Sequence, residues 1–176
     1  MQRFILTGAP GAGKTTIIRR LAERGLATVA EAATDIIARE QADGIDAPWE
    51  HPEFIDRIAR LQAERIDAAI DPVQLHDRSP VCTLALARHL DVPVPDSLHR
   101  LLDRIATRRL FVRRVFFVDG LDFIERTAAR RIGLADARRF GVLHARIYEE
   151  LGYELVTIPP GPADARAEFL RAQLVA

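Results

Sequence analysis

The sequence has one cysteine, one lysine, no net charge and no long hydrophobic run. Because Cys82 is the only cysteine, an intramolecular disulfide and a cysteine-built zinc site are excluded, which fits a reducing compartment. The 25 basic residues equal the 25 acidic residues in number, so no overall field would draw the chain to nucleic acid or to an anionic membrane. A membrane span needs about 18 apolar residues in succession, and we expect neither a span nor a signal peptide. We therefore expect a cytoplasmic protein.

The pattern of apolar residues predicts one α/β domain over residues 1–176. Of the 176 residues, 48% are hydrophobic, which is enough to form a core. Short apolar runs predict strands at residues 3–7, 26–30, 73–77, 114–118 and 154–158. Helical spacing predicts helices at residues 14–24, 32–41, 52–70, 80–90, 96–110 and 163–174, with a further helical pattern from residue 140. This alternation predicts a three-layer sandwich in which helices cover both faces of a five-stranded parallel sheet.

Residues 8–15 form a glycine-rich phosphate-binding motif. They read Gly-Ala-Pro-Gly-Ala-Gly-Lys-Thr, which fits G-x-x-x-x-G-K-[ST], and they lie between a predicted strand and a predicted helix. Glycines let successive backbone N–H groups point inward, and the helix N-terminus adds partial positive charge. The Lys14 ammonium would reach the β- and γ-phosphates, and the Thr15 hydroxyl would hold Mg²⁺. The expected nucleotide contacts are Gly8, Ala9, Pro10, Gly11, Ala12, Gly13, Lys14, Thr15 and Thr16.

Lys14 is the single lysine among the 25 basic residues. A bias toward arginine codons accounts for the arginines but not for this exception. A lysine supplies a compact point charge, whereas an arginine supplies a broad fork. The exception therefore falls where the motif needs a point charge.

Polar residues follow the strand predicted at residues 73–77. Asp77 ends that strand, and the carboxyl ends of parallel strands face the crevice where ligands bind. Asp77 could therefore complete the Mg²⁺ site with Thr15, or else Asp77 or Ser79 could cap the helix that begins at Pro80. Arg78 could contact a phosphate or a hydroxyl of the substrate, or form an ordinary surface ion pair.

Glu31 follows the strand predicted at residues 26–30 and lies at the same edge of the sheet. Its carboxylate could take a proton from a substrate hydroxyl. It could equally be a favourable charge in the first turn of the next helix. The pattern alone does not separate these two roles.

Several segments together resemble a known family. They are Thr7-Gly-Ala-Pro-Gly-Ala-Gly-Lys-Thr15, Val29-Ala-Glu-Ala-Ala33, Ile36-Ile-Ala-Arg-Glu-Gln41, Asp77-Arg-Ser79 and Tyr148-Glu-Glu-Leu-Gly-Tyr153. In these segments the chain resembles the small AAA-type NTPase domains related to nicotinamide riboside kinases and, more distantly, the deoxynucleoside kinases. The resemblance covers nearly the whole chain. It implies a P-loop kinase sheet of strand order 2-3-1-4-5, Glu31 as the base, and Asp77 and Arg78 as contacts to metal and substrate.

The sequence departs from this family's pattern in two places. Relatives often carry a basic residue where Thr34 stands, and a longer segment with aromatic residues where residues 119–122 stand. The substrate therefore cannot be transferred from the family.

A lid is predicted at residues 119–134. Arg126 and Arg130 lie four residues apart there, on one face of a helical stretch that also contains Arg131. They could close over the triphosphate and neutralise the charge that develops on the transferred phosphoryl group. The alternative is a solvated arginine face.

Two further residues are candidates for substrate contact. Gln62 is a polar amide within an apolar helical stripe, so it needs hydrogen-bond partners. In nucleoside kinases a glutamine on this helix can read the edge of the base, but an internal hydrogen bond would also satisfy Gln62. Trp49 could stack on a planar substrate or pack at the edge of the sheet.

Two functions remain open on the sequence. The first is a small-molecule kinase that binds ATP and Mg²⁺ and phosphorylates a hydroxyl, on a nucleoside or a similar riboside. Its catalytic residues would be Lys14, Glu31, Asp77, Arg126 and Arg130, and Glu31, Trp49, Gln62 and Arg78 would contact the acceptor. The second is an NTPase switch that acts on a protein or lipid partner. A guanine-reading Asn-Lys-x-Asp motif is absent, which weakens a GTPase version of this switch and leaves an ATPase.

Overall fold

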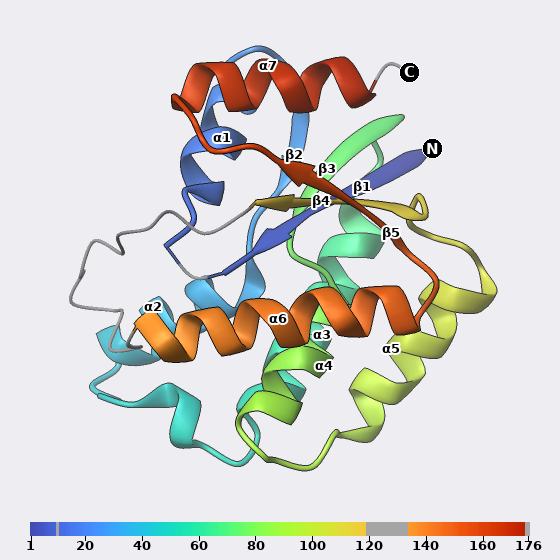
Figure 1. Cartoon of the computed structure of the whole chain (residues 1–176). Helices are drawn as coiled ribbons and strands as arrows, with labels where there is room; N and C mark the ends of the chain where they lie inside the picture. The colour runs from blue at the N-terminus through green and yellow to red at the C-terminus, as the bar shows by residue number, and fades with distance from the viewer. Residues whose placement is uncertain (10, 119–133, 175–176) are drawn as a thin grey trace.

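The computed structural model describes residues 1–9, 11–118 and 134–174 (Figure 1). The strands are β1 (Gln2–Gly8), β2 (Ala27–Val29), β3 (Val73–Asp77), β4 (Arg114–Val118) and β5 (Glu154–Ile158). The helices are α1 (Lys14–Ala22), α2 (Ala32–Ala42), the 3₁₀ turn η1 (Pro48–Glu50), α3 (Phe54–Ala68), α4 (Pro80–His89), α5 (Asp96–Thr107), α6 (Leu134–Glu150) and α7 (Ala163–Leu174). Among these described helices, none combines the length and the apolar character needed to span a bilayer.

The five strands form one parallel sheet of order β2-β3-β1-β4-β5. This confirms the strand order that the family resemblance implies. The central strand β1 pairs on one side with β3, where Leu6 lies opposite Asp77, and on the other with β4, where Gly8 lies opposite Val118. The register therefore places the start of the glycine loop beside the ends of both neighbouring strands.

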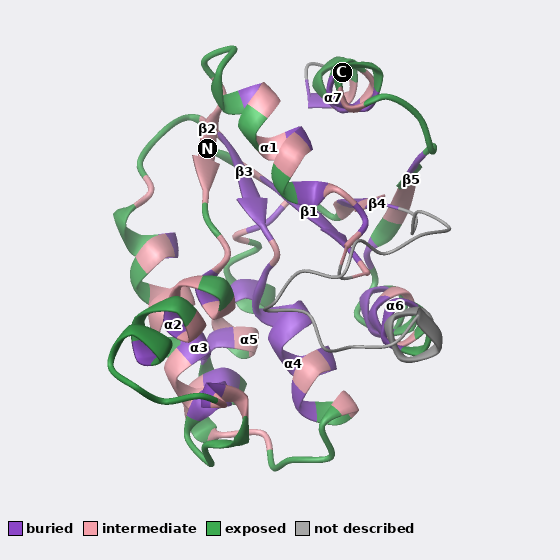
Figure 2. Ribbon diagram, turned by 90° about the vertical axis from the view of Figure 1, so that its left-hand side faces the viewer, coloured by how far each residue is buried: buried purple, intermediate pink, exposed green. Residues whose placement is uncertain are grey.

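Helices cover both faces of the sheet, and β1 supplies side chains to each face. Phe4 and Leu6 are buried with residues of α1 and α7, whereas Ile5 is buried with residues of α2 to α6. Successive side chains of a strand point to opposite faces, so one continuous apolar run serves two cores. Figure 2 shows this as buried strands between two layers of helices whose outer surfaces are exposed.

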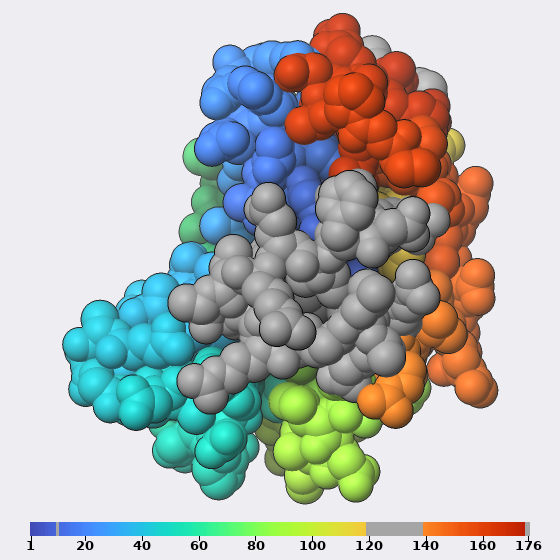
Figure 3. Space-filling view, turned by 60° about the vertical axis from the view of Figure 1, so that its left-hand side comes forward, coloured from blue at the N-terminus to red at the C-terminus, as the bar shows by residue number. Residues whose placement is uncertain are grey.

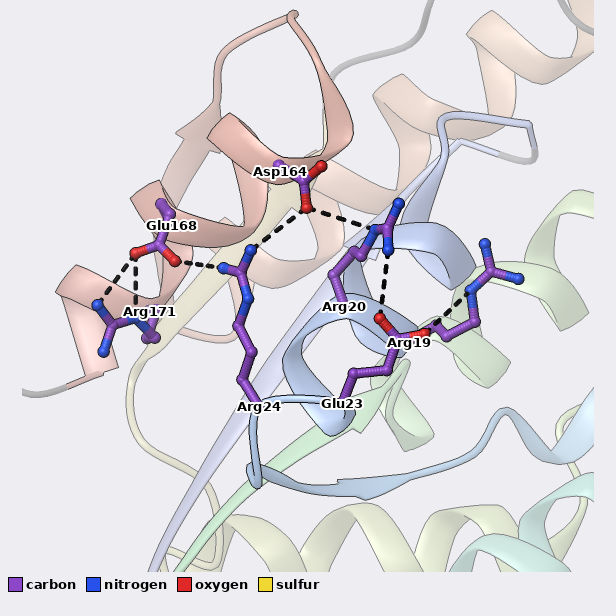
Figure 4. A network of polar contacts seen from close by, with 7 residues as sticks. All are labelled: Arg19, Arg20, Glu23, Arg24, Asp164, Glu168 and Arg171. Atoms are coloured by element: carbon purple, nitrogen blue, oxygen red, sulfur yellow. Dashed lines mark hydrogen bonds and ion pairs between the residues drawn. The ribbon is translucent and has the colours of Figure 1, made fainter.

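The helices α1 and α7 lie side by side on one face of the sheet, and Figure 3 shows their segments, blue and red, at the top of the molecule. A network of ion pairs joins their exposed sides (Figure 4). Arg24 pairs with both Asp164 and Glu168, and Arg20 bridges Glu23 and Asp164 at 3.3 and 3.4 Å. The apolar core beneath and the ion pairs outside thus hold α7 against the helix that begins at the glycine loop.

Candidate functional site

The glycine loop between β1 and α1 has a backbone that only glycine fits easily. Gly8, Gly11 and Gly13 have φ angles of 137°, 84° and 87°, values that side chains rarely allow. A Cβ added at Gly8 would lie 2.3 Å from the carbonyl oxygen of Val118, which is far inside van der Waals contact. The motif therefore needs its glycines both for its conformation and for its close approach to β4.

Lys14 is the first residue of α1 and is buried, with 6% of its surface exposed. Its ammonium donates hydrogen bonds to the carbonyl oxygens of Gly8 at 3.2 Å and Ala9 at 2.9 Å. Burial and the neighbouring Arg78 lower the pKa of Lys14 to about 7, although Glu31 and Asp77 partly oppose this. A phosphate close to Lys14 would stabilise its charged form, because an anion raises the pKa of a cation beside it.

The other predicted nucleotide contacts lie around the N-terminus of α1. Gly13 is the N-cap residue and makes no side-chain capping bond, so the first N–H groups of the helix have no side-chain acceptor there. Thr15 is exposed and Thr16 is half-buried in the first turn. This is the arrangement in which a helix end binds an anion.

Asp77 lies at the carboxyl end of β3, directly beside β1. Only 8% of it is exposed, and its Oδ1 atom has no hydrogen-bond partner among the described residues. Burial and the nearby Glu31 raise its pKa to about 6, against the opposing effect of Arg78 and Lys14. Of the two residues predicted as possible caps of the next helix, Ser79 is confirmed and Asp77 is not, because the Ser79 hydroxyl accepts the bond from the Val81 amide at 3.2 Å.

Glu31 and Arg78 form a close ion pair between the ends of β2 and β3. Arg78 Nε lies 2.5 Å from Glu31 Oε1, and both side chains are largely buried. The other oxygen of Glu31 accepts a bond from the Thr34 hydroxyl at 2.9 Å. Burial alone would raise the pKa of Glu31, but Arg78 and Lys14 outweigh it and lower that pKa. Glu31 is therefore a carboxylate at neutral pH.

The backbone at Arg78 explains how its side chain reaches Glu31. Arg78 has a positive φ of 68°, and its amide donates to the Leu6 carbonyl at 3.0 Å. Non-glycine residues adopt this conformation uncommonly, and it often marks a functional segment. The fold thus brings Lys14, Glu31, Asp77 and Arg78 together from the ends of three adjacent strands.

Gln62 lies near this cluster, on α3. Its Oε1 atom accepts a hydrogen bond from the buried Thr83 hydroxyl of α4 at 2.9 Å. The internal bond that the sequence allowed is therefore present. Gln62 also lines a small cavity with room for about one water molecule, whose wall includes Asp77, Arg78 and Phe111.

Trp49 is not brought into this cluster by any contact that the structure describes. It is half-buried on η1 and packs against the core on the side of α2 to α6. The turn η1 contacts mainly α2 and α3. The predicted packing at the edge of the sheet is thus replaced by packing between helices.

Some predicted site residues lie outside the described residues. These are Pro10, Arg126 and Arg130, together with residues 119–133 of the predicted lid. Residue 134, which the prediction placed in the lid, is instead the first residue of α6.

The structure also shows residues near the site that the sequence did not indicate. From α3, Arg65 donates to the Ala30 carbonyl at 2.8 Å and pairs with Asp35, so it holds both sides of the Glu31 turn. Tyr148 of α6 contacts the Ser79 hydroxyl at 2.7 Å and the Cys82 sulfur at 3.1 Å. Tyr148 begins a segment that carries the family resemblance, but no local pattern predicts these contacts, because each joins segments at least 30 positions apart.

The cluster fits a Mg²⁺ ion that shares its ligands with phosphates. No group of three or more potential ligands from His, Cys, Asp and Glu occurs among the described residues, so a cage made of protein alone is not indicated. Mg²⁺ usually takes one or two carboxylates and completes its shell with water and phosphate oxygens. The unpartnered Asp77 oxygen and the exposed Thr15 hydroxyl suit that pattern.

Comparisons with known proteins agree with this geometry. Residues 3–166 match a family model described as an AAA domain. No curated protein matches the sequence.

Solved structures with the same fold include three kinds of protein. NadR in complex with NR has a TM-score of 0.74 and 16% identity, over 99% of this chain and 52% of NadR, so the chain spans about half of that protein. A deoxyadenosine kinase from M. mycoides has a TM-score of 0.65 and 12% identity, over 99% of this chain and 98% of the kinase. A shikimate kinase from Acinetobacter baumannii in complex with shikimate has a TM-score of 0.59 and 18% identity, over 99% of this chain and 94% of the kinase. At these identities the likeness establishes the fold.

Proposed function

Since the chain belongs to the family of AAA domains, we propose that it is an ATP-dependent phosphotransferase acting on a small molecule with a free hydroxyl. The observation that carries this proposal is the cluster of Glu31, Asp77 and Arg78 beside Lys14. A base, a metal ligand and two cations meet there at one edge of the sheet. We propose that the chain acts as a single domain.

We propose that ATP binds with its phosphates in the glycine loop. The N-terminus of α1 and the Lys14 ammonium would balance the charge of the β- and γ-phosphates. Binding would draw Lys14 from the Gly8 and Ala9 carbonyls, which now accept its hydrogen bonds. In the chain, the predicted lid with Arg126 and Arg130 comes after β4, and β4 ends beside Gly8.

Thr15 and Asp77 would hold Mg²⁺, which when bound neutralises charge on the phosphate oxygens. The acceptor would lie close to Glu31 and Asp77, beside the small cavity lined by Gln62, Arg65 and Phe111, which itself has room for only about one water molecule. The neighbours with this fold include a deoxyadenosine kinase and a protein in complex with NR, which favours a nucleoside or a riboside as acceptor.

Glu31 would act as the general base. It would accept the proton of the acceptor hydroxyl while that oxygen forms a bond to the γ-phosphorus, the bond from phosphorus to the bridging oxygen breaks, and ADP leaves. Arg78 holds the Glu31 carboxylate in place and keeps it ionised. Most of the catalysis would come from positioning and from charge neutralisation.

To test this, the wild-type chain and Glu31→Gln are each incubated with MgATP and a panel of nucleosides and ribosides, and the phosphorylated products are measured. We expect one acceptor to yield a phosphorylated product, and Glu31→Gln to lower transfer by about 100-fold or more while ADP binding is unchanged. Glu23→Gln, at an exposed site on the far side of α1, is the matched control and should keep the wild-type rate. ATP hydrolysis without any phosphorylated acceptor would favour the NTPase switch instead.

A further inference from the structure

The C-terminal helix α7 sends one charged side chain into the glycine loop. Arg166 is in the first turn of α7 and is only 4% exposed. Its Nη1 atom donates a hydrogen bond to the carbonyl oxygen of Ala12 at 3.1 Å. A buried guanidinium is costly to place in a protein interior, so this contact is a specific feature of the site.

The loop is shaped to receive this guanidinium. A Cβ at Gly13 would lie 3.1 Å from Arg166 Nη1, so the bare glycine lets the arginine approach its backbone. The Ala12 side chain is 1% exposed and packs in the same core as Ala167 and Leu170 of α7. The turn at residues 12–13 is therefore fixed to α7 by both an apolar contact and a charged hydrogen bond.

Fixing the Ala12 carbonyl also fixes the direction of the next amide. The described residues contain no cis peptide bond, and in a trans peptide the carbonyl and the following N–H point in opposite directions. Because Arg166 holds the Ala12 carbonyl toward α7, the Gly13 N–H points away from α7. Because this amide is already oriented before the ligand arrives, no conformational entropy is lost in orienting it when the phosphate binds.

We infer that Arg166 is a positioning residue for phosphate binding, which sets the orientation of the Ala12–Gly13 peptide from the opposite side of the loop. It acts through the loop backbone. This inference rests on the proposed binding of nucleotide phosphates at the loop. It adds a residue of α7 to the phosphate-binding loop between β1 and α1.

The experiment measures the affinity for MgADP by calorimetry in the wild-type chain, Arg166→Met and Arg166→Lys. Methionine keeps the length and the packing of the side chain but removes the donor. We expect Arg166→Met to weaken ADP binding by about tenfold, because the Ala12–Gly13 peptide would then have to be ordered when the phosphate binds. Lysine keeps one donor and the charge, so Arg166→Lys should recover part of the affinity.

Two variants of the same helix separate positioning from stability. Leu170→Ala weakens the packing of α7 but keeps the hydrogen bond from Arg166, so it should lower the melting temperature and reduce the ADP affinity much less than Arg166→Met does. Arg171→Met removes an exposed arginine that pairs with Glu168 and should change neither. If Leu170→Ala lost as much affinity as Arg166→Met, the role of Arg166 would be structural and the inference would be wrong.

A spectroscopic measurement reports the loop directly. Labelling with ¹⁵N-glycine gives at most ten backbone signals, because the chain has ten glycines. The Gly13 signal should shift with ADP in the wild-type chain and start from a different position in Arg166→Met. If Arg166→Met binds ADP within twofold of the wild-type affinity and its Gly13 signal is unmoved, the inference is wrong but the proposed function is not affected. Failure of the wild-type chain to bind ADP or ATP overturns the proposed function and the inference with it.

Discussion

At the scale of single residues, Asp77 is the clearest case of a side chain whose position lowers the stability of the folded chain. Its carboxyl group is buried, and one of its oxygens has no hydrogen-bond partner among the residues described. A buried polar atom without a partner usually costs free energy. Such a cost is typical of residues that are kept for binding or catalysis.

This cost predicts a pH dependence of folding. The pKa of Asp77 is about 6 in the folded chain and ordinarily 3.8. Between these values the folded state binds more protons than the unfolded state, so its stability falls as the pH rises through that window. The full difference corresponds to at most about 3 kcal/mol. Asp77→Asn should therefore be more stable than wild type at pH 8, and the difference should shrink toward pH 4.

Thermal unfolding with a metal chelator present, at several pH values, would measure this difference. Groups far from Asp77 titrate equally in both proteins, so the difference reports Asp77 together with Lys14 and Glu31, which interact with it. Parallel curves for wild type and Asp77→Asn between pH 4 and pH 7 would contradict the expectation.

At the scale of secondary-structure elements, the turn between β2 and α2 depends on a third element. Arg65 of α3 holds the Ala30 carbonyl and pairs with Asp35, on either side of Glu31. The strand β2 has only three residues, so it fixes this turn weakly by itself. The position of the proposed base is therefore set by α3.

Arg65→Met should accordingly lower kcat by about tenfold while the affinity for ADP stays unchanged, because a misplaced base affects transfer and not phosphate binding. Steady-state kinetics and ADP calorimetry would measure the two quantities. Arg60→Met is the matched control, because Arg60 lies on the same helix, is largely exposed and pairs with Asp56 one turn earlier. An equal loss of kcat in both variants would show a general effect of α3.

The elements show what the sequence could and could not predict. The strands at residues 73–77, 114–118 and 154–158 have the predicted bounds, because buried apolar runs next to turn residues are a local signal. The helix predicted to reach residue 110 ends at Thr107, because Arg109 adopts a positive φ of 49° and the Leu110 amide bonds the Ile105 carbonyl. That ending depends on backbone geometry at residues other than glycine, which composition does not reveal.

The same division holds in the site. Glu31 and Asp77 could be proposed from the sequence because Asp77 ends a predicted strand and Glu31 directly follows one. Arg65 and Arg166 could not, because their partners lie 35 and 154 positions away. Long-range contacts of this kind depend on the way the helices pack.

At the scale of the whole molecule, the ion-pair network between α1 and α7 joins the two ends of the chain (Figure 4). Its members are 35% to 67% exposed, and isolated exposed pairs contribute little. Here Arg24 pairs with Asp164 and Glu168 at once, so one ordered side chain serves two contacts. The network should therefore add modestly to the stability of the α1–α7 contact.

Replacing both acids, Asp164→Asn with Glu168→Gln, should lower the stability by about 1 kcal/mol and the melting temperature by about 3 °C in low salt. The loss should largely disappear in 1 M salt, where the screening length is about 3 Å. Thermal unfolding at both salt concentrations would measure it. A loss that is the same at both concentrations would mean that the two substitutions act through packing.

The central place of β1 has a consequence for how the chain is made. Of the five strands β1 is synthesised before the others, yet its two neighbours in the sheet, β3 and β4, end at residues 77 and 118. On a ribosome β1 therefore keeps one unpaired edge until residue 118 has emerged. Arg166 emerges later still. The phosphate loop, which is made before either neighbouring strand, would thus take its working shape only after the segment that carries Arg166 has emerged.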